Sequence, residues 1–380
     1  MNKTGEVVLP LHRGHAPSWL VQRMKALADE MVRVIVLDQG VEAFLNHVSD
    51  PYWFQAFGCV LGFDWHSSGL TTVVTGVLKN VLTFERHGVN LAGGKGSASR
   101  KSPFEIEQSA LRAGLSTSKI SELKRASRMC AKVDTAAIQS GYPIYHHAFF
   151  LAENGKWAVV QQGISASDST ARRYHWQSDN LQSFVEEPHE AVVGDCVKSN
   201  VLDMTAVDSA ENRKICLDLV RDRPQNLISS VKSICFSEQT LDGWTGEHSE
   251  PPRVTLEQLR NYQAYSMPSR LDWQVFYDLY DVRPKNYEEL LAFEGVGPAT
   301  VRALALVSQL IYGVPVSWKD PVKFSFAHGG KDGVPFPVNR SAMDGSVNYL
   351  REMLEASEVE RDLKTDGLKR IEKISTEWGL

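Results

Sequence analysis

Apolar residues recur every three or four positions along most of the chain, a pattern that predicts a mainly helical protein. This spacing predicts helices over 18–37 and 69–82, the second with Ser67 or Ser68 as its N-cap. A short strand is expected near residues 6–11, and two further helices are expected over 104–135. Residues 196–318 are also expected to be mainly helical, with a polar linker at 241–254. An amphipathic helix is expected at the C-terminal end, after a Gly/Pro-rich stretch.

Residues 141–193 differ, because their apolar positions have the spacing and composition of strands. The stretch "YHHAFFLAENGKWAVVQQG" (145–163) predicts a β-hairpin around Asn154-Gly155, a dipeptide that favours a two-residue type I′ turn. Such a turn would pair Glu153 with Lys156, and counting outward would place His147 opposite Gln162. Tyr145, His147, Phe149 and Gln162 would then share one face of the sheet.

Polar residues gather at the open end of this hairpin, and a third strand-like run, "ARRYHW" (171–176), follows it. His189 comes shortly afterwards. Histidine can transfer protons near neutral pH, and arginine can stabilise the charged transition state of phosphodiester cleavage. The candidate catalytic residues are therefore His147, Gln162, Arg173 and His175.

Two alternatives to a catalytic site exist for these residues. They could instead satisfy one another and nearby backbone groups at the end of the sheet. A metal site is disfavoured, because adjacent histidines on a strand diverge and no carboxylate or cysteine lies at ligand spacing. The sequence predicts no metal ligands, and whether the protein requires a divalent metal stays open.

Charge is distributed unevenly along the 380 residues, whose net charge is −5. Residues 86–132 hold ten Lys/Arg against three Glu, and a localised basic segment is typical of a nucleic-acid binder. It could equally be a solvated helical face. Within it, "GGKGSASRK" (93–101) is expected to form a mobile basic loop that carries Lys95, Arg100 and Lys101. The Walker pattern is absent from this loop, so no NTP site is predicted.

The stretch "ALRAGLSTSKISEL" (110–123) has the spacing of a helix–turn–helix: Ala110, then Gly114 in the turn, then Ile120. Lys119 would be exposed beside the turn and could contact DNA. A plain helical hairpin explains the same spacing equally well.

The stretch "YEELLAFEGVGPATVRALALVSQLIYG" (287–313) is similar to the helix–hairpin–helix motif, which holds DNA through its phosphates without reading sequence. Two glycines allow close backbone approach, and the N–H groups at the start of the second helix can bind a phosphate. The candidate DNA-binding residues here are Gly295, Val296, Gly297 and Thr300. The alternative is a glycine-rich link between two packed helices. DNA glycosylases of this superfamily carry a lysine where this chain has Ala299, although Asp320 lies near the interval of their aspartate.

Several segments together resemble one family: "LPLHRGHAPSWLVQRM", "DWHSSGLTTVV", "YHH…WAVVQQG", "ARRYHW" and "AHGGKDGVPFPVNR". This is the uncharacterised, largely archaeal family called domain of unknown function 763, and the resemblance spans about residues 5–350. It implies a cytosolic protein with a C-terminal helix–hairpin–helix, and it implies no activity. The family commonly has an aspartate where this chain has Ser140.

We therefore predict an α+β, predominantly helical protein in three parts. Residues 1–135 would form a helical region with the basic loop, residues 136–240 a central antiparallel hairpin followed by helices, and residues 255–380 a helix–hairpin–helix domain with a helical tail. No apolar stretch approaches the roughly 20 residues of a membrane span, so we expect a cytoplasmic protein. The basic segment and the helix–hairpin–helix motif predict DNA as its partner.

The leading functional hypothesis is a nuclease of DNA repair or recombination that acts on structured or damaged DNA. The alternative is a non-catalytic, structure-specific DNA-binding or recruiting protein, and the third hypothesis is a DNA glycosylase. The sequence leaves open the structure of the substrate, whether the substrate is DNA or RNA, and the oligomeric state.

Overall fold

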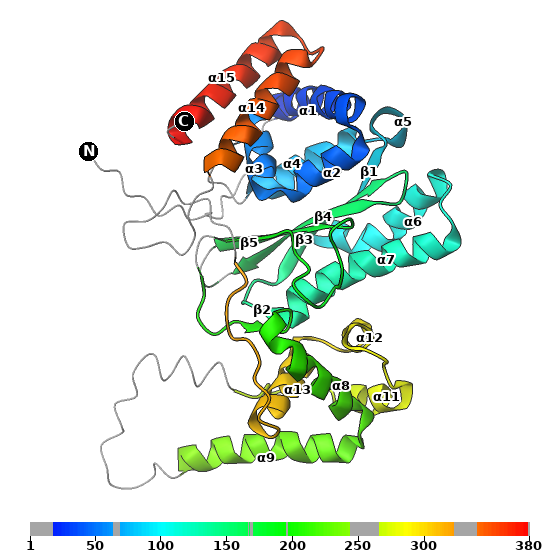
Figure 1. The fold of residues 1–380 in the computed structure, drawn as a ribbon, viewed down its shortest axis with the longest axis vertical. Coiled ribbons are helices and arrows are strands. Elements are labelled where there is room, and N and C mark those ends of the chain that lie inside the picture. Colours follow the sequence, from blue (N-terminus) through cyan, green and yellow to red (C-terminus); the bar gives the residue numbers. More distant parts are fainter. Residues whose placement is uncertain are drawn as a thin grey trace, which may run out of the picture.

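The computed structural model describes residues 18–63, 69–165, 167, 170–194, 197–243, 266–322 and 340–378. Within them, a five-stranded antiparallel sheet lies in the middle of the molecule, with helices on both sides (Figure 1). The protein is α+β and predominantly helical, as predicted. The strand expected near residues 6–11, Ser67, Ser68 and most of the expected linker lie outside the described residues.

One face of the sheet is covered by the N-terminal helices: α1 (Ser18–Gln39), α2 (Val41–Ser49), α3 (Pro51–Val60) and α4 (Gly69–Val81), followed by the short α5 (Phe84–His87). Asp50 begins α3, because its carboxylate accepts hydrogen bonds from the backbone N–H groups of Tyr52 and Trp53. Phe54 and Leu70 pack with Phe150 and Val160 of the sheet in one apolar core. The helices predicted over 18–37 and 69–82 are confirmed.

The C-terminal helices α14 (Arg340–Ala356) and α15 (Arg361–Trp378) also belong to this side of the molecule (Figure 1). We expected the tail to be part of a helix–hairpin–helix domain of residues 255–380, whereas both helices pack against α3. Leu350, Leu354 and Ile371 are buried in the same core as the N-terminal helices. An amphipathic pattern shows that a helix buries one face, and it does not identify the surface that covers that face.

The strands lie in the order β1 (Val89–Lys95), β3 (Ile144–Ala152), β4 (Trp157–Ser165), β5 (Thr170–Gln177) and β6 (Ala191–Gly194). Our prediction of a mobile loop over 93–101 was wrong, because β1 pairs with β3 and continues into the 3-10 helix η1 (Gly96–Lys101). The glycines of β1 have low strand propensity, so the sequence pattern did not indicate a strand here. Gly93 is required there: a Cβ at this position would lie 2.2 Å from the carbonyl oxygen of His147.

The β3–β4 hairpin is confirmed, but its register differs by one residue from the prediction. Ala152 donates to the Lys156 carbonyl at 2.9 Å and Gly155 donates to the Ala152 carbonyl at 2.9 Å, so the loop has three residues. Gly155 has φ +81°, as in a type I turn followed by a left-handed glycine. His147 is therefore paired with Gln161, and His146 with Gln162.

The other face of the sheet is covered by α6 (Ser102–Arg112) and α7 (Thr117–Lys132), which confirm the helix pair predicted over 104–135. Gly114 has φ +71° in the turn between them, and Ala110 and Ile120 are buried. The apolar side of α7 packs on the sheet, with Leu123 in the same core as Phe149. After α7 the chain makes a π-helical turn, η2 (Val133–Ala137).

A helical unit lies beyond α7, on the side away from the N-terminal helices (Figure 1). It contains α8 (Ala210–Arg221), α9 (Pro224–Gly243), α11 (Trp273–Val282), α12 (Tyr287–Ala292) and α13 (Pro298–Leu310). A small two-stranded sheet, β2 (Ile138–Gln139) with β7 (Leu202–Asp203), joins this unit to η2. The 3-10 helix η3 (Val207–Ser209) leads into α8.

Candidate functional site

The four predicted catalytic residues do not converge, because they lie on both faces of the sheet. Gln162, Arg173 and His175 point toward the N-terminal helices, whereas His147 points toward α7. The one-residue change of register explains the separation, since successive side chains on a strand point to opposite faces. His146, rather than His147, is paired with Gln162.

The three residues on the N-terminal side form part of a buried polar network. Arg173 Nε donates to His175 Nε2 at 2.9 Å, and its Nη1 donates to Gln55 Oε1 at 3.0 Å. His175 Nδ1 lies 3.0 Å from the Val48 carbonyl oxygen, and Gln162 donates to the Tyr145 hydroxyl at 2.7 Å. Burial lowers the pKa of His175 well below its ordinary value. These contacts correspond to the alternative in which the groups satisfy one another and the backbone.

A second polar network crosses the opposite face of the sheet and contains His147. Ser127 Oγ lies 2.9 Å from His147 Nε2, and His147 Nδ1 lies 2.7 Å from Gln161 Oε1. Gln161 Nε2 donates to the carboxylate of Asp134. Asp134 Oδ1 lies 2.5 Å from His189 Nε2. The chain of hydrogen bonds therefore runs from α7 through two strands to His189.

Asp134 is the centre of this network, and its side chain is fully buried. Its carboxylate also accepts a 3.0 Å hydrogen bond from Trp176 Nε1. The residue lies on the π-helical turn η2, and such turns are frequent at functional sites. A buried carboxylate that binds one imidazole nitrogen fixes the orientation of the ring. Asp134 thus orients the imidazole ring of His189.

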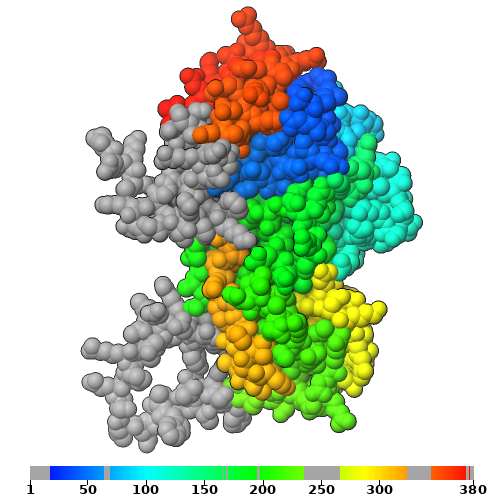
Figure 2. Space-filling model, viewed as in Figure 1, coloured from blue at the N-terminus to red at the C-terminus, as the bar shows by residue number. Residues whose placement is uncertain are grey.

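His189 lines a cavity of about 210 Å³ between β6, η3 and the segment after α13. Asp203, Thr205, Ser317 and Lys319 also line it. Burial raises the pKa of Asp203, although the hydrogen bonds from Thr205 oppose this effect. The two segments that form the cavity, green and orange in Figure 2, lie side by side on the surface.

Sequence reasoning noticed His189 but missed Asp134 and the cavity. Asp134 is one acid at the end of a helical stretch, and no local pattern distinguishes it from a surface residue. The available signal was its apolar surroundings, Cys130, Val133, Ala136 and Ala137, all of which are buried. An acid within such a stretch is buried only where the fold provides donors for it.

The predicted DNA-binding hairpin connects α12 and α13 and lies on the surface at Gly295 and Pro298. Gly295 has φ +87°, and a Cβ there would lie 2.7 Å from Val275 Cγ2. Val296 and Thr300 are buried, so their side chains support the hairpin from within.

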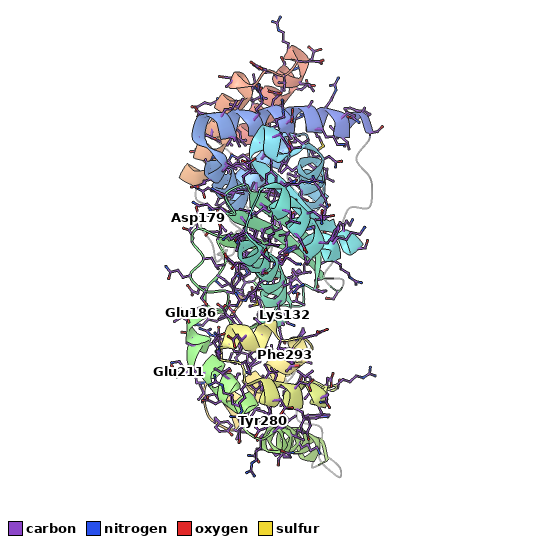
Figure 3. All side chains as sticks on the ribbon, turned by 90° about the vertical axis from the view of Figure 1, so that its right-hand side faces the viewer. Lys132, Asp179, Glu186, Glu211, Tyr280 and Phe293 are labelled. Atoms are coloured by element: carbon purple, nitrogen blue, oxygen red, sulfur yellow. The ribbon has the colours of Figure 1, made fainter. Side chains whose placement is uncertain are left out.

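The hairpin is attached at both ends to the segment that carries Asp134. Lys132 Nζ donates to the Phe293 carbonyl at 3.2 Å, and Figure 3 shows these two residues close together. Gln139 Nε2 donates to the Pro298 carbonyl at 2.8 Å. The hairpin and the Asp134 network are therefore parts of one contiguous structure.

The predicted basic residues are distributed over two ends of the sheet. Lys95, Arg100 and Lys101 are exposed at the end where β1 pairs with His146. Lys119 lies at the other end, beside Gly155 of the hairpin loop. Eight residues of strand separate these ends by roughly 25 Å, so the basic residues do not form one compact patch.

In the part of the chain that the structure describes, no group of three His, Cys, Asp or Glu side chains could hold a metal ion. No helix among the described residues is long and apolar enough to span a bilayer. A family model described as protein of unknown function (DUF763) matches residues 5–338. No curated protein matches the chain, and no solved structure does.

Proposed function

Because the chain belongs to the DUF763 family, whose function is unknown, we propose a function from its own geometry: the protein binds the phosphate backbone of DNA through the α12–α13 hairpin. The observation that carries this proposal is the hairpin itself. Its exposed backbone precedes a helix of 13 residues, and its buried Val296 anchors it to the core. N–H groups at a helix N-terminus attract phosphate oxygens, and they contact the backbone without reading bases.

Replacing Gly297 with leucine is expected to weaken DNA binding at least tenfold without lowering the melting temperature. Gly297 has φ −129°, and a Cβ there would meet no atom within 4 Å, so the fold accepts a side chain. The side chain would nevertheless hold a phosphate away from the N–H groups of the hairpin. Fluorescence anisotropy with several unrelated duplexes measures the loss, which should be similar for all of them.

The matched control is Gly76→Leu, at an exposed position of α4 where a Cβ also meets nothing within 4 Å. This variant should bind DNA like the parent. Equal affinities for the parent and Gly297→Leu would exclude the hairpin as the DNA contact.

A second candidate function, hydrolysis of the bound DNA, is favoured by the Asp134–His189 pair beside the cavity. His189 would act as general base on water, with Asp134 stabilising the imidazolium that forms. We assign this role to His189 rather than to His147 or His175, because His189 lines the cavity and the other two histidines do not.

His189→Ala is expected to lower the rate of DNA cleavage or base release at least about 100-fold, while DNA affinity changes little. His175→Ala is the control, since it removes a buried histidine from the opposite face. That variant should have a lower melting temperature and an unchanged activity per folded molecule. The assay uses end-labelled single strands, duplexes, junctions and lesion-bearing duplexes, each with and without Mg²⁺, before and after alkali. Absence of any product with the parent protein would reject hydrolysis and leave the DNA-binding proposal standing.

A further inference from the structure

The cavity beside His189 is rich in hydrogen-bond acceptors. Glu187, Asp203, Asp208 and Asp320 line it, against Lys319 and His189. Asp320 is paired with Arg172, and Asp208 lies 3.3 Å from Lys319 at the exposed rim. Glu187 and Asp203 remain as the carboxylates that a ligand would meet, so the cavity disfavours a phosphate and favours a group with N–H donors.

Asp203 is the more buried of these two carboxylates, with a relative exposure of 4%. Thr205 donates to it twice, from the backbone N–H at 2.8 Å and from the hydroxyl at 2.6 Å. Both of these bonds go to Oδ1, and the backbone N–H of Ala206 also donates to the Asp203 carboxylate. A carboxylate has about four acceptor positions, so these three donors leave Asp203 about one position for a donor from a ligand.

The cavity is adjacent to the hairpin through the small β2–β7 sheet. Gln139 of β2 donates to the Pro298 carbonyl of the hairpin. Its neighbour Ile138 is paired with Asp203 on β7, and Asp203 is bridged in turn to Ser317. Strands in a sheet lie about 5 Å apart, so one pair of strands connects the hairpin to the floor of the cavity.

The volume of about 210 Å³ is below the roughly 300–1,000 Å³ of pockets for drug-sized ligands. One planar ring system is the size of ligand that it fits. Proteins that act on a single base take it out of the stack into a pocket and read its hydrogen-bonding edge. Carboxylates accept from the exocyclic amino groups of bases, such as N4 of cytosine.

We propose that this cavity receives one unpaired nucleobase of the bound DNA and prefers a base with an amino group at the position of adenine N6 or cytosine N4 over thymine. The inference rests on the proposed DNA binding by the hairpin. It adds a specificity that backbone contacts cannot supply. Asp203 and Glu187 are the residues that accept the amino group, and His189 lies at the same cavity.

The test measures the affinity of the full chain for duplexes that are identical except for one bulged nucleotide: adenine, cytosine or thymine. The parent protein should bind the adenine and cytosine bulges at least about fivefold more tightly than the thymine bulge. Asp203→Asn should reduce this preference to below twofold, because the amide presents a donor as well as an acceptor. Glu187→Gln should reduce the preference for the adenine and cytosine bulges in part. Because Glu187 is exposed, this variant keeps the test valid if Asp203→Asn does not fold.

Asp179→Asn is the matched control, since Asp179 pairs with Lys156 near the β3–β4 loop, away from the cavity. It should retain the full preference. Equal binding of the three bulges by the parent, or an undiminished preference in folded Asp203→Asn and Glu187→Gln, would overturn the inference while DNA binding stands. Failure to bind any DNA would overturn the DNA-binding proposal and this inference with it.

Discussion

Replacing Asp320 with alanine is expected to lower the free energy of unfolding by about 3–5 kcal/mol, the usual cost of removing one partner of a buried ion pair. Arg172 Nη1 and Nη2 donate to the two carboxylate oxygens at 2.9 and 2.7 Å, and both side chains are fully buried. The backbone N–H groups of Lys198 and Val322 donate to the same carboxylate. Alanine would leave the buried guanidinium without this bidentate partner. Urea unfolding at pH 7 measures the change.

The neighbouring Lys319→Ala is the matched control, because Lys319 is 84% exposed and its ion pair with Asp208 lies at the surface. It should change stability by less than about 1 kcal/mol. The double variant Arg172→Met/Asp320→Leu should recover most of the loss, since apolar groups can replace a buried pair. A loss below 1 kcal/mol for Asp320→Ala would contradict the buried pair.

Acidification from pH 7 to pH 4 is expected to lower stability by several kcal/mol through buried histidines. Burial lowers the pKa of His146 to about 3 and that of His47 to about 4, from an ordinary 6.5. The unfolded chain therefore binds more protons than the folded chain below pH 6.5, and stability falls as pH decreases from 6.5 toward these values. Each of the two histidines should account for about 2–3 kcal/mol at pH 4. Above pH 7 neither histidine makes the free energy of unfolding depend on pH.

His47→Phe tests this effect at one position. The His47 ring stacks on Trp53, with centroids 5.0 Å apart, and its Nε2 has no hydrogen-bond partner in the described part of the chain. Phenylalanine preserves the stacking and cannot be protonated, so stability at pH 7 should change little. The loss between pH 7 and pH 4 should shrink by about 2–3 kcal/mol. Trp19→Phe, at a residue that is 63% exposed, should leave the pH profile unchanged. An equally steep profile in His47→Phe would show that His47 is not the titrating group.

The register of the central hairpin shows where the predicted grouping of residues differs from the structure. Asn154-Gly155 correctly marks the turn, but the same dipeptide suits both a two-residue loop and a three-residue loop with a left-handed glycine. The two loops differ by one residue, and one residue moves every side chain of a strand to the other face. His147 was therefore placed with Gln162, whereas it belongs to the network of Asp134.

The sequence by itself determined that most of the chain is helical and that its central region holds the β3–β4 hairpin and β5, because apolar spacing records which side of each element is buried. It also determined the glycine turns at Gly114 and Gly295, where φ is positive. Only the tertiary structure decided that β1 is a strand, that α14 and α15 pack on α3, and that Asp134 meets His189. These features depend on contacts between residues far apart in the chain, and local propensity and periodicity carry no information about which distant surface supplies the partner.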